Sequence, residues 1–249
     1  MLILLPASEG KAEQGSGPPF GALSFPGLDR SRERVLKALI RASRRRDALD
    51  VLGLTPGLAG ELDKNLALRT APALPAGALY TGVLYDNLGL AALSDEAAKR
   101  AEESVLIFSG LWGVLRVTDR VPPYRLSMGV SLPPLGGLAA FWRPAVSKEL
   151  DGVDGPVDGL VVDMRSSAYA GAWRPGSRSV GVRVLRGGKV VSHMAKATRG
   201  VIARALLEAG ADPGTPYELA EMLGELGHDV RLSDEPAAGR AWTLDVRVS

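Results

Sequence analysis

Short, almost wholly apolar runs of strand length constrain this fold more than any other feature of the sequence. They are "MLILL" at residues 1–5, "VLIF" at 105–108 and "GLVVDM" at 159–164. A run with no polar alternation predicts a strand that is buried on both faces. Amphipathic patterns lie between and after these runs and predict helices; they cover residues 29–46, 94–104, 138–150, 195–210 and 216–227. We therefore predict one irregular mixed α/β (α+β) domain over residues 1–249, with a mixed sheet and flanking helices.

Two hairpins are predicted near the end of the chain. In "SVGVRVLRGGKVVSHM", two alternating runs flank Gly187–Gly188, which suits a tight turn. Residues 228–248 predict a second hairpin. This irregular order disfavours a Rossmann fold or a barrel. The chain also lacks GxGxxG after a strand and GxxxxGK[ST], the usual nucleotide-binding fingerprints.

The composition limits which kinds of site the chain can hold. It has no cysteine and two histidines, so we expect no disulfide, no transition-metal site and no bound cofactor. A net charge of +2 with a pI near 9.0 permits nucleic-acid binding without demanding it. No apolar run has the length of a membrane span, and the N-terminal run resembles a first strand more than a signal peptide. We expect a cytoplasmic protein, monomeric rather than oligomeric.

Polar side chains gather where predicted strands end, which is where α/β proteins place their sites. The candidate residues are Ser8, Glu9 and Lys11 after the first strand, Ser109 after the second, Ser166 and Tyr169 after the third, and Lys196 and Arg199 after the first hairpin. If these strands are neighbours, the groups form a pocket for an anion. The alternative is that each cluster is an ordinary polar strand end.

Lys196 and Arg199 are more specific evidence for an anion site. They lie three residues apart in the predicted first turn of a helix, where the macrodipole disfavours cations. A bound anion such as phosphate would offset that cost. A structural ion pair with Glu9 or Asp163 would offset it equally well.

The stretch "FSGLWGVLRVTDRVPPYRLSMG", residues 108–129, concentrates bulky polar side chains between glycines and prolines. We predict that Arg116 pairs with Asp119 and that Arg116, Tyr124 and Arg125 line an anion cleft. The alternative is a rigid structural loop around a buried Trp112.

Several of these segments resemble the YaaA family of peroxide-stress proteins. They are "LLPASEGK", "YTGVLYDNLG", residues 108–132, Phe141–Trp142, "VVDMRSSAYAGAW" and "AKATRG". The central stretch is similar to a family hallmark that reads SGLYG-x-LRP-x-D-x-x-x-PYRLEMG; Trp112 and Val117 depart from it. The resemblance spans almost the whole chain. It implies an irregular α/β domain with a positively charged cleft, DNA binding, and protection of DNA from iron-driven oxidation.

The family resemblance also implies a helix-hairpin-helix-like element, which matches residues 49–66 here. Its tight turn between short helices suits contact with a DNA phosphate, and Lys64 and Arg69 are the basic residues nearby. A simple helix turn is the alternative.

Two functions remain open at this point. One is a DNA-binding protein of the peroxide and oxidative stress response. The other is an enzyme acting on a nucleotide or another phosphorylated small molecule, with Glu9 and Lys196 as its catalytic groups. The sequence does not name a substrate.

Overall fold

The computed structural model describes residues 1–151, 159–191 and 193–248. Its centre is a mixed sheet in the order β11-β12-β9-β8-β1-β3-β4, with β10 paired to β9. The strands are β1 (Leu2–Pro6), β3 (Val105–Ser109), β4 (Gly113–Arg116), β8 (Val161–Asp163), β9 (Ser179–Arg186), β10 (Lys189–Val190), β11 (Val230–Leu232) and β12 (Trp242–Val248). The prediction of a mixed α/β fold is confirmed.

The five central strands are parallel and the two outer strands are antiparallel to their neighbours. In register, Ile3 lies beside Val105 and Leu2 beside Val161. The three apolar runs therefore form adjacent strands, and the side chains of β1 from Leu2 to Leu5 are buried. This register brings the carboxyl ends of β1, β3 and β8 to one edge, called here the carboxyl edge.

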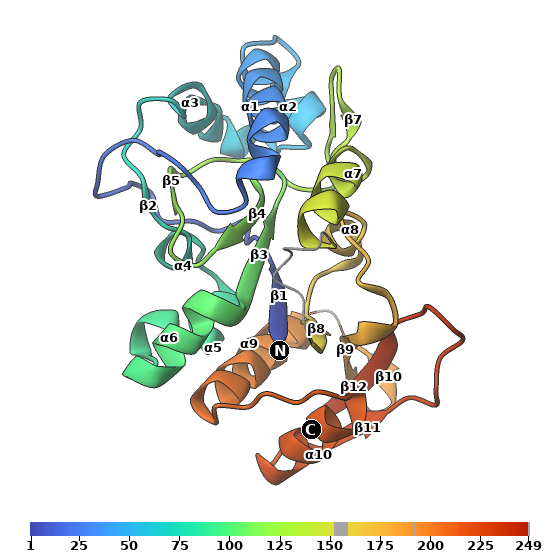
Figure 1. Cartoon of the computed structure of the whole chain (residues 1–249). Helices are drawn as coiled ribbons and strands as arrows, with labels where there is room; N and C mark the ends of the chain where they lie inside the picture. The colour runs from blue at the N-terminus through green and yellow to red at the C-terminus, as the bar shows by residue number, and fades with distance from the viewer. Residues whose placement is uncertain (152–158, 192, 249) are drawn as a thin grey trace.

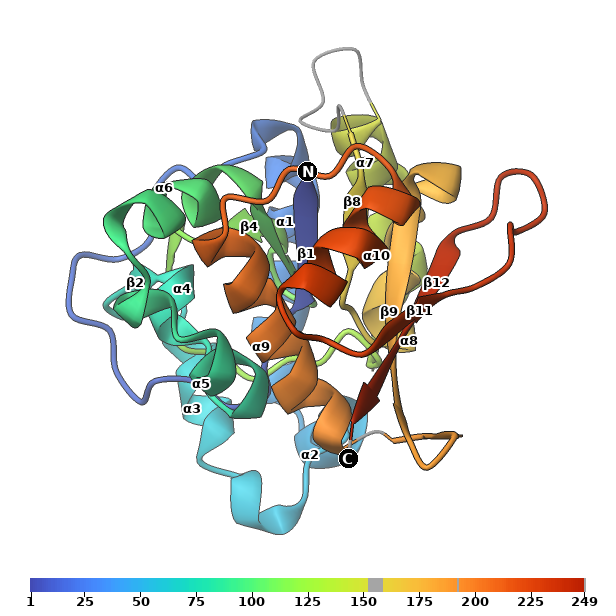
Figure 2. The same ribbon diagram turned by 90° about the horizontal axis from the view of Figure 1, so that it is seen from below.

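Helices cover both faces of the sheet (Figures 1 and 2). On one face lie α1 (Asp29–Ser43) and α7 (Leu138–Leu150); on the other lie α9 (His193–Glu208) and α10 (Pro216–Glu225). Helix α1 buries its apolar stripe, including Val35, Leu36 and Leu39. It ends three residues before the predicted boundary, because Arg44 to Arg46 lie outside the helix.

The segment between β1 and β3 also carries several shorter helices. It contains α2 (Ala48–Leu52), α3 (Glu61–Leu66), α4 (Ala76–Leu79), α5 (Val83–Leu88) and α6 (Asp95–Ser104), and the 3-10 turns η1 (Pro26–Leu28), η2 (Pro56–Leu58) and η3 (Leu90–Ala92). Helix α9 packs against both α5 and α6. Ser94 caps the start of α6, since its hydroxyl accepts the backbone N–H of Ala97.

Short elements complete the chain. They are β2 (Leu74–Pro75), β5 (Arg120–Val121), β6 (Ser131–Leu132), β7 (Gly136–Gly137), α8 (Ser167–Ala170) and η4 (Gly176–Arg178). Both predicted hairpins form; Gly187 and Gly188 have positive φ angles of 55° and 76°, which their turn requires. Strand β12 also pairs in parallel with β9, a long-range contact that the sequence pattern did not indicate.

Candidate anion-binding site

The carboxyl edge brings the turn after β1 and the loop after β3 close together. Gly110 makes this approach feasible, because a Cβ there would lie 3.0 Å from the carbonyl oxygen of Leu126. Gly82 lies beside the same turn, with a φ of 99° and a Cβ position 3.3 Å from the Ser8 hydroxyl. Segments 8–11, 80–82 and 108–126 thus meet at one place.

Lys11 carries the positive charge at the point where these segments meet. Its Nζ donates to the carbonyl oxygen of Ser8 at 2.7 Å. The same atom lies 4.4 Å from the ring centroid of Tyr124 and 5.5 Å from that of Tyr80. Burial lowers the pKa of the Lys11 amine to about 8, with Glu9 acting in the opposite direction. Among the residues that the structure describes, no carboxylate lies within 4.0 Å of this amine.

A buried chain of hydroxyls lies close to Lys11. The Tyr80 and Tyr124 hydroxyls are 2.9 Å apart, and the Tyr124 hydroxyl lies 2.6 Å from that of Ser109. Ser109 also accepts the backbone N–H groups of Leu111 and Trp112. Burial raises the pKa of Tyr80 to about 12 and that of Tyr124 well above its usual value, so these phenols stay neutral.

These buried hydroxyl contacts correct the predicted roles of Ser109 and Tyr124. We expected both to face a ligand, but Ser109 is 0% exposed and Tyr124 is 1% exposed. Their polar atoms are engaged inside the fold, so they support Lys11 and the loop instead. Trp112 is buried in the same loop, which agrees with the alternative of a rigid structural loop.

Arg125 lies beside Lys11 and binds Glu9. Its Nη2 is 3.0 Å from a Glu9 carboxylate oxygen, and its Nη1 donates to the Glu9 carbonyl at 3.2 Å. Buried Asn65 fixes the backbone of Arg125 through two hydrogen bonds, of 2.8 Å to its N–H and 3.0 Å to its carbonyl. Glu9, Lys11, Tyr80, Tyr124 and Arg125 are called the edge cluster below.

Two residues of this region were not predicted from the sequence: Tyr80, within the edge cluster, and Asn65, which supports it. Tyr80 stands in "YTGVLYDNLG", a segment quoted for the family resemblance, so a signal for it existed. Asn65 lies in α3 and carries no local pattern that distinguishes it from a surface residue. Only its burial and its two bonds to Arg125 reveal its role.

Ser8 and Tyr169 belong to the surroundings of the edge cluster. Ser8 contributes its carbonyl to Lys11, and its hydroxyl lies near Gly82. Burial, and then the carboxylate of Glu9, raise the pKa of the Tyr169 phenol. Ser166 occupies the position before α8, and its side chain makes no capping bond to that helix.

The two cations at the start of α9 have different surroundings. Arg199 donates to the carbonyl of Val182 in β9 at 2.9 Å, and burial lowers its pKa, partly offset by Asp163. Its buried Nε has no hydrogen-bond partner. Lys196 is exposed and forms no ion pair with any residue in the described ranges. That Lys196 and Arg199 bind an anion stays a prediction.

Arg116 requires a correction. Its guanidinium donates to the carbonyls of Glu102 and Glu103 at the end of α6, away from the carboxyl edge. Asp119 does not pair with that guanidinium; it accepts the Arg116 backbone N–H at 2.8 Å and two hydrogen bonds from Ser24. Arg116 therefore closes a helix end and is no wall of an anion cleft.

The helix-hairpin-helix-like element consists of α2, η2 and α3. Gly53 ends α2 in the left-handed conformation, with a φ of 64°. Lys64 pairs with Glu61 at 2.5 Å and Arg69 with Glu33 at 2.6 Å. Both predicted DNA contacts are thus neutralised within the protein, and whether they reach DNA stays a prediction.

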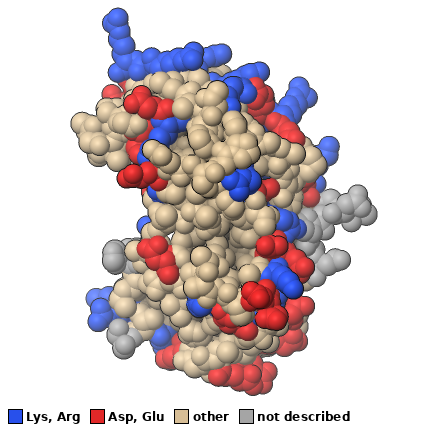
Figure 3. Space-filling view, turned by 90° about the vertical axis from the view of Figure 1, so that its left-hand side faces the viewer, with Lys and Arg blue, Asp and Glu red and all other residues tan. Residues whose placement is uncertain are grey.

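The surface is hollowed on the side to which the carboxyl ends of the parallel strands point. The hollow is visible at the left edge of Figure 3, between the part that carries α1–α3 and the part that carries α9. On the drawn face, basic and acidic side chains mix. Within the described ranges, no three His, Cys, Asp or Glu side chains group as a metal site would need. No helix in those ranges is both long and apolar enough to cross a membrane.

Comparison with known proteins gives a consistent assignment. The family model described as "Peroxide stress protein YaaA" matches residues 1–228. The UPF0246 protein SCO2297 of Streptomyces coelicolor is 52% identical, over 100% of this chain and 98% of its own length. The UPF0246 protein CE1889 of Corynebacterium efficiens is 38% identical over 100% of both chains. The resemblance predicted from the sequence is thereby confirmed, and this chain belongs to the YaaA family of peroxide stress proteins.

Proposed function

We propose that this protein binds DNA in the hollow at the carboxyl edge and so limits oxidative damage to DNA during peroxide stress. The observation that carries the proposal is Lys11, a half-buried cation with no carboxylate beside it in the described structure. With a pKa of about 8, the amine is mostly protonated at pH 7. A DNA phosphate would supply the missing negative charge.

Neighbouring groups suit the same ligand. Arg125 is 20% exposed and pairs with Glu9, so a phosphate can share its guanidinium. Exposed Lys196 extends the positive charge along the start of α9. In the exposed turn from Gly53 to Gly57, Thr55 and Gly57 offer backbone N–H groups to a second phosphate.

The test is fluorescence anisotropy with a labelled duplex and three proteins: wild type, Lys11→Met and Lys99→Met. Lys99 is a matched control, because it is an exposed lysine on α6, whose carboxyl end leads into the opposite end of β3. We expect Lys11→Met to weaken binding about tenfold, since a charge-assisted contact contributes ~1.5–3 kcal/mol. Its log-log salt slope should fall by about one. Equal losses in both variants, or no binding by wild type, would contradict the proposal.

A second candidate is an enzyme acting on a nucleotide or a similar phosphorylated small molecule. It is favoured by the chemistry of the edge cluster, where Glu9 acts on a lysine of lowered pKa and also on the phenol of Tyr169. Tracking a DNA backbone does not need such a compact set. Calorimetric titration with free nucleoside phosphates separates the two functions: tight, saturable nucleotide binding without duplex binding would favour the enzyme.

A further inference from the structure

The carboxylate of Glu9, two residues before Lys11, is bound by another cation. Glu9 pairs with Arg125 through a charged contact of 3.0 Å, and Arg125 also bonds the Glu9 carbonyl. The only side-chain hydrogen bond of Lys11 runs to the Ser8 carbonyl, among the described residues. Lys64, by contrast, keeps a carboxylate partner, Glu61. Lys11 is therefore half-buried, with no carboxylate within 4.0 Å among the residues that the structure describes.

We infer that Lys11 is a nucleophile that forms an imine with the aldehyde left on DNA where a base has been lost. This inference rests on the proposed DNA binding and extends it to a class of damaged substrate. An unprotonated, desolvated lysine amine attacks carbonyl carbons and forms Schiff bases. Loss of a base leaves a deoxyribose whose ring opens to an aldehyde, with a phosphate on either side. Those phosphates would lie against Arg125 and the start of α9.

The step needs no oxidant, reductant or metal. The neutral amine nitrogen attacks the aldehyde carbon and forms a C–N bond, while the carbonyl π electrons move to oxygen. A proton passes from nitrogen to that oxygen and gives a carbinolamine. The C–O bond then breaks, hydroxyl leaves as water with a second proton from nitrogen, and a C=N bond remains.

Glu9 is placed to move these protons. Its side chain is 47% exposed, so it reaches a bound sugar while it keeps Arg125 as partner. The tyrosines of the edge cluster do not ionise near neutral pH, because burial raises the pKa of Tyr80 to about 12 and that of Tyr124 well above its usual value. They form an uncharged floor under the amine, which keeps its desolvation high.

Borohydride trapping tests the inference. Full-length protein is mixed with a labelled duplex that contains one abasic site, or with the intact duplex, and sodium borohydride is added. Reduction converts an imine into a stable secondary amine, so a covalent protein–DNA band is expected only with the abasic duplex. Mass analysis of the digested adduct should place the modification on Lys11.

Two variants keep the test decisive. Lys11→Arg retains the positive charge and should bind the abasic duplex but lose the covalent band. Lys99→Met should keep both. An adduct on another lysine, or a wild-type protein that binds the abasic duplex without being trapped, would overturn the inference. A circular dichroism spectrum identical to wild type checks that Lys11→Arg is folded.

A third arm separates this inference from the proposed function. The protein is trapped with deoxyribose 5-phosphate, a small aldehyde that does not depend on DNA binding. Labelling of Lys11 by the sugar together with no affinity for any duplex would sustain the nucleophile and refute the DNA proposal. Duplex binding with no labelling in either trapping arm would refute the nucleophile alone.

Discussion

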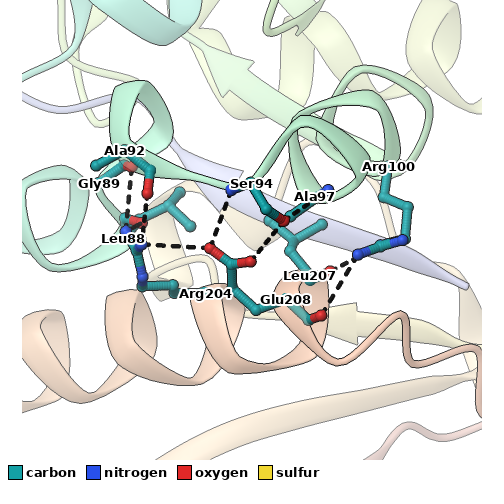
Figure 4. A network of polar contacts seen from close by, with 9 residues as sticks. All are labelled: Leu88, Gly89, Ala92, Ser94, Ala97, Arg100, Arg204, Leu207 and Glu208. Atoms are coloured by element: carbon teal, nitrogen blue, oxygen red, sulfur yellow. Dashed lines mark hydrogen bonds and ion pairs between the residues drawn. The ribbon is translucent and has the colours of Figure 1, made fainter.

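Two polar clusters in this molecule consist of similar residue types but have different roles. The first, called the seam network here, consists of Ser94, Arg100, Arg204 and Glu208 and joins α6 to α9 (Figure 4). Arg204 donates to the carbonyls of Leu88, Gly89 and Ala92 and pairs with Glu208. Each drawn group there has its partner within the protein.

The edge cluster differs in one respect. Arg125 and Glu9 satisfy each other, but Lys11 has a carbonyl and two aromatic rings where a carboxylate would be expected. The seam network lowers the pKa of Glu208, chiefly through the Ser94 hydroxyl, and so favours its charged state. Burial at the edge cluster disfavours the charged state of Lys11. A network that stabilises its charges holds the fold, and one that leaves a charge without a partner suits a ligand.

Arg204→Met should give the largest change in stability. The substitution leaves three backbone carbonyls without their donor and removes the partner of Glu208. We expect the free energy of unfolding to fall by about 2–3 kcal/mol in urea titrations. DNA affinity should be unchanged, because the seam lies away from the edge cluster. An Arg204→Met protein that is as stable as wild type would show that the seam network does not stabilise the fold.

The pH dependence of stability should distinguish the edge cluster from the seam network. The groups that act on the charge of Lys11 are Glu9 and Glu61, which favour it, and Arg125 and Lys64, which oppose it. Since the folded pKa is about 8 against 10.5 for the free amine, the unfolded chain binds more protons between these values. The stability of wild type relative to Lys11→Met should therefore rise as pH increases from 8 towards 10.5.

The same titration has opposite effects on the two proposed activities. DNA affinity should fall as pH passes 8, because the cation is lost, by about tenfold or ~1.4 kcal/mol. Imine trapping should increase over the same interval, because the neutral amine is the reactive form. If both quantities moved in the same direction, Lys11 would not serve as both charge and nucleophile.

Lys64→Glu combined with Arg69→Glu should give the smallest effect. If Lys64 and Arg69 were unpaired and both contacted the DNA backbone, the log-log salt slope of the variant would fall by about two. Because both already pair with Glu61 and Glu33, we expect a change of less than about one. A full loss of two contacts would place α3 in the interface and make the helix-hairpin-helix-like element, rather than the edge cluster, the main DNA contact.

Local patterns were sufficient for the elements of this fold. The buried strands, the helices over residues 29–46 and 94–104, and both hairpins follow from periodicity, capping residues and glycine turns, which act over a few neighbouring residues. The same patterns predicted that polar groups after β1 and β3 would meet, because parallel strands end at the same edge.

Which of those polar groups can face a ligand depends on the tertiary structure. Ser109, Tyr124 and Arg116 have suitable chemistry, but burial or a helix end engages them. Asn65 and Tyr80 joined the site through contacts with residues far along the chain, at positions 125 and 124. Residue type and spacing determine what a side chain can bind, whereas its partners depend on which distant segments pack against it. Local residue patterns therefore specify the elements and the edge where they meet, whereas the packing of distant segments at that edge leaves Lys11 with no carboxylate within 4.0 Å in the described part of the chain.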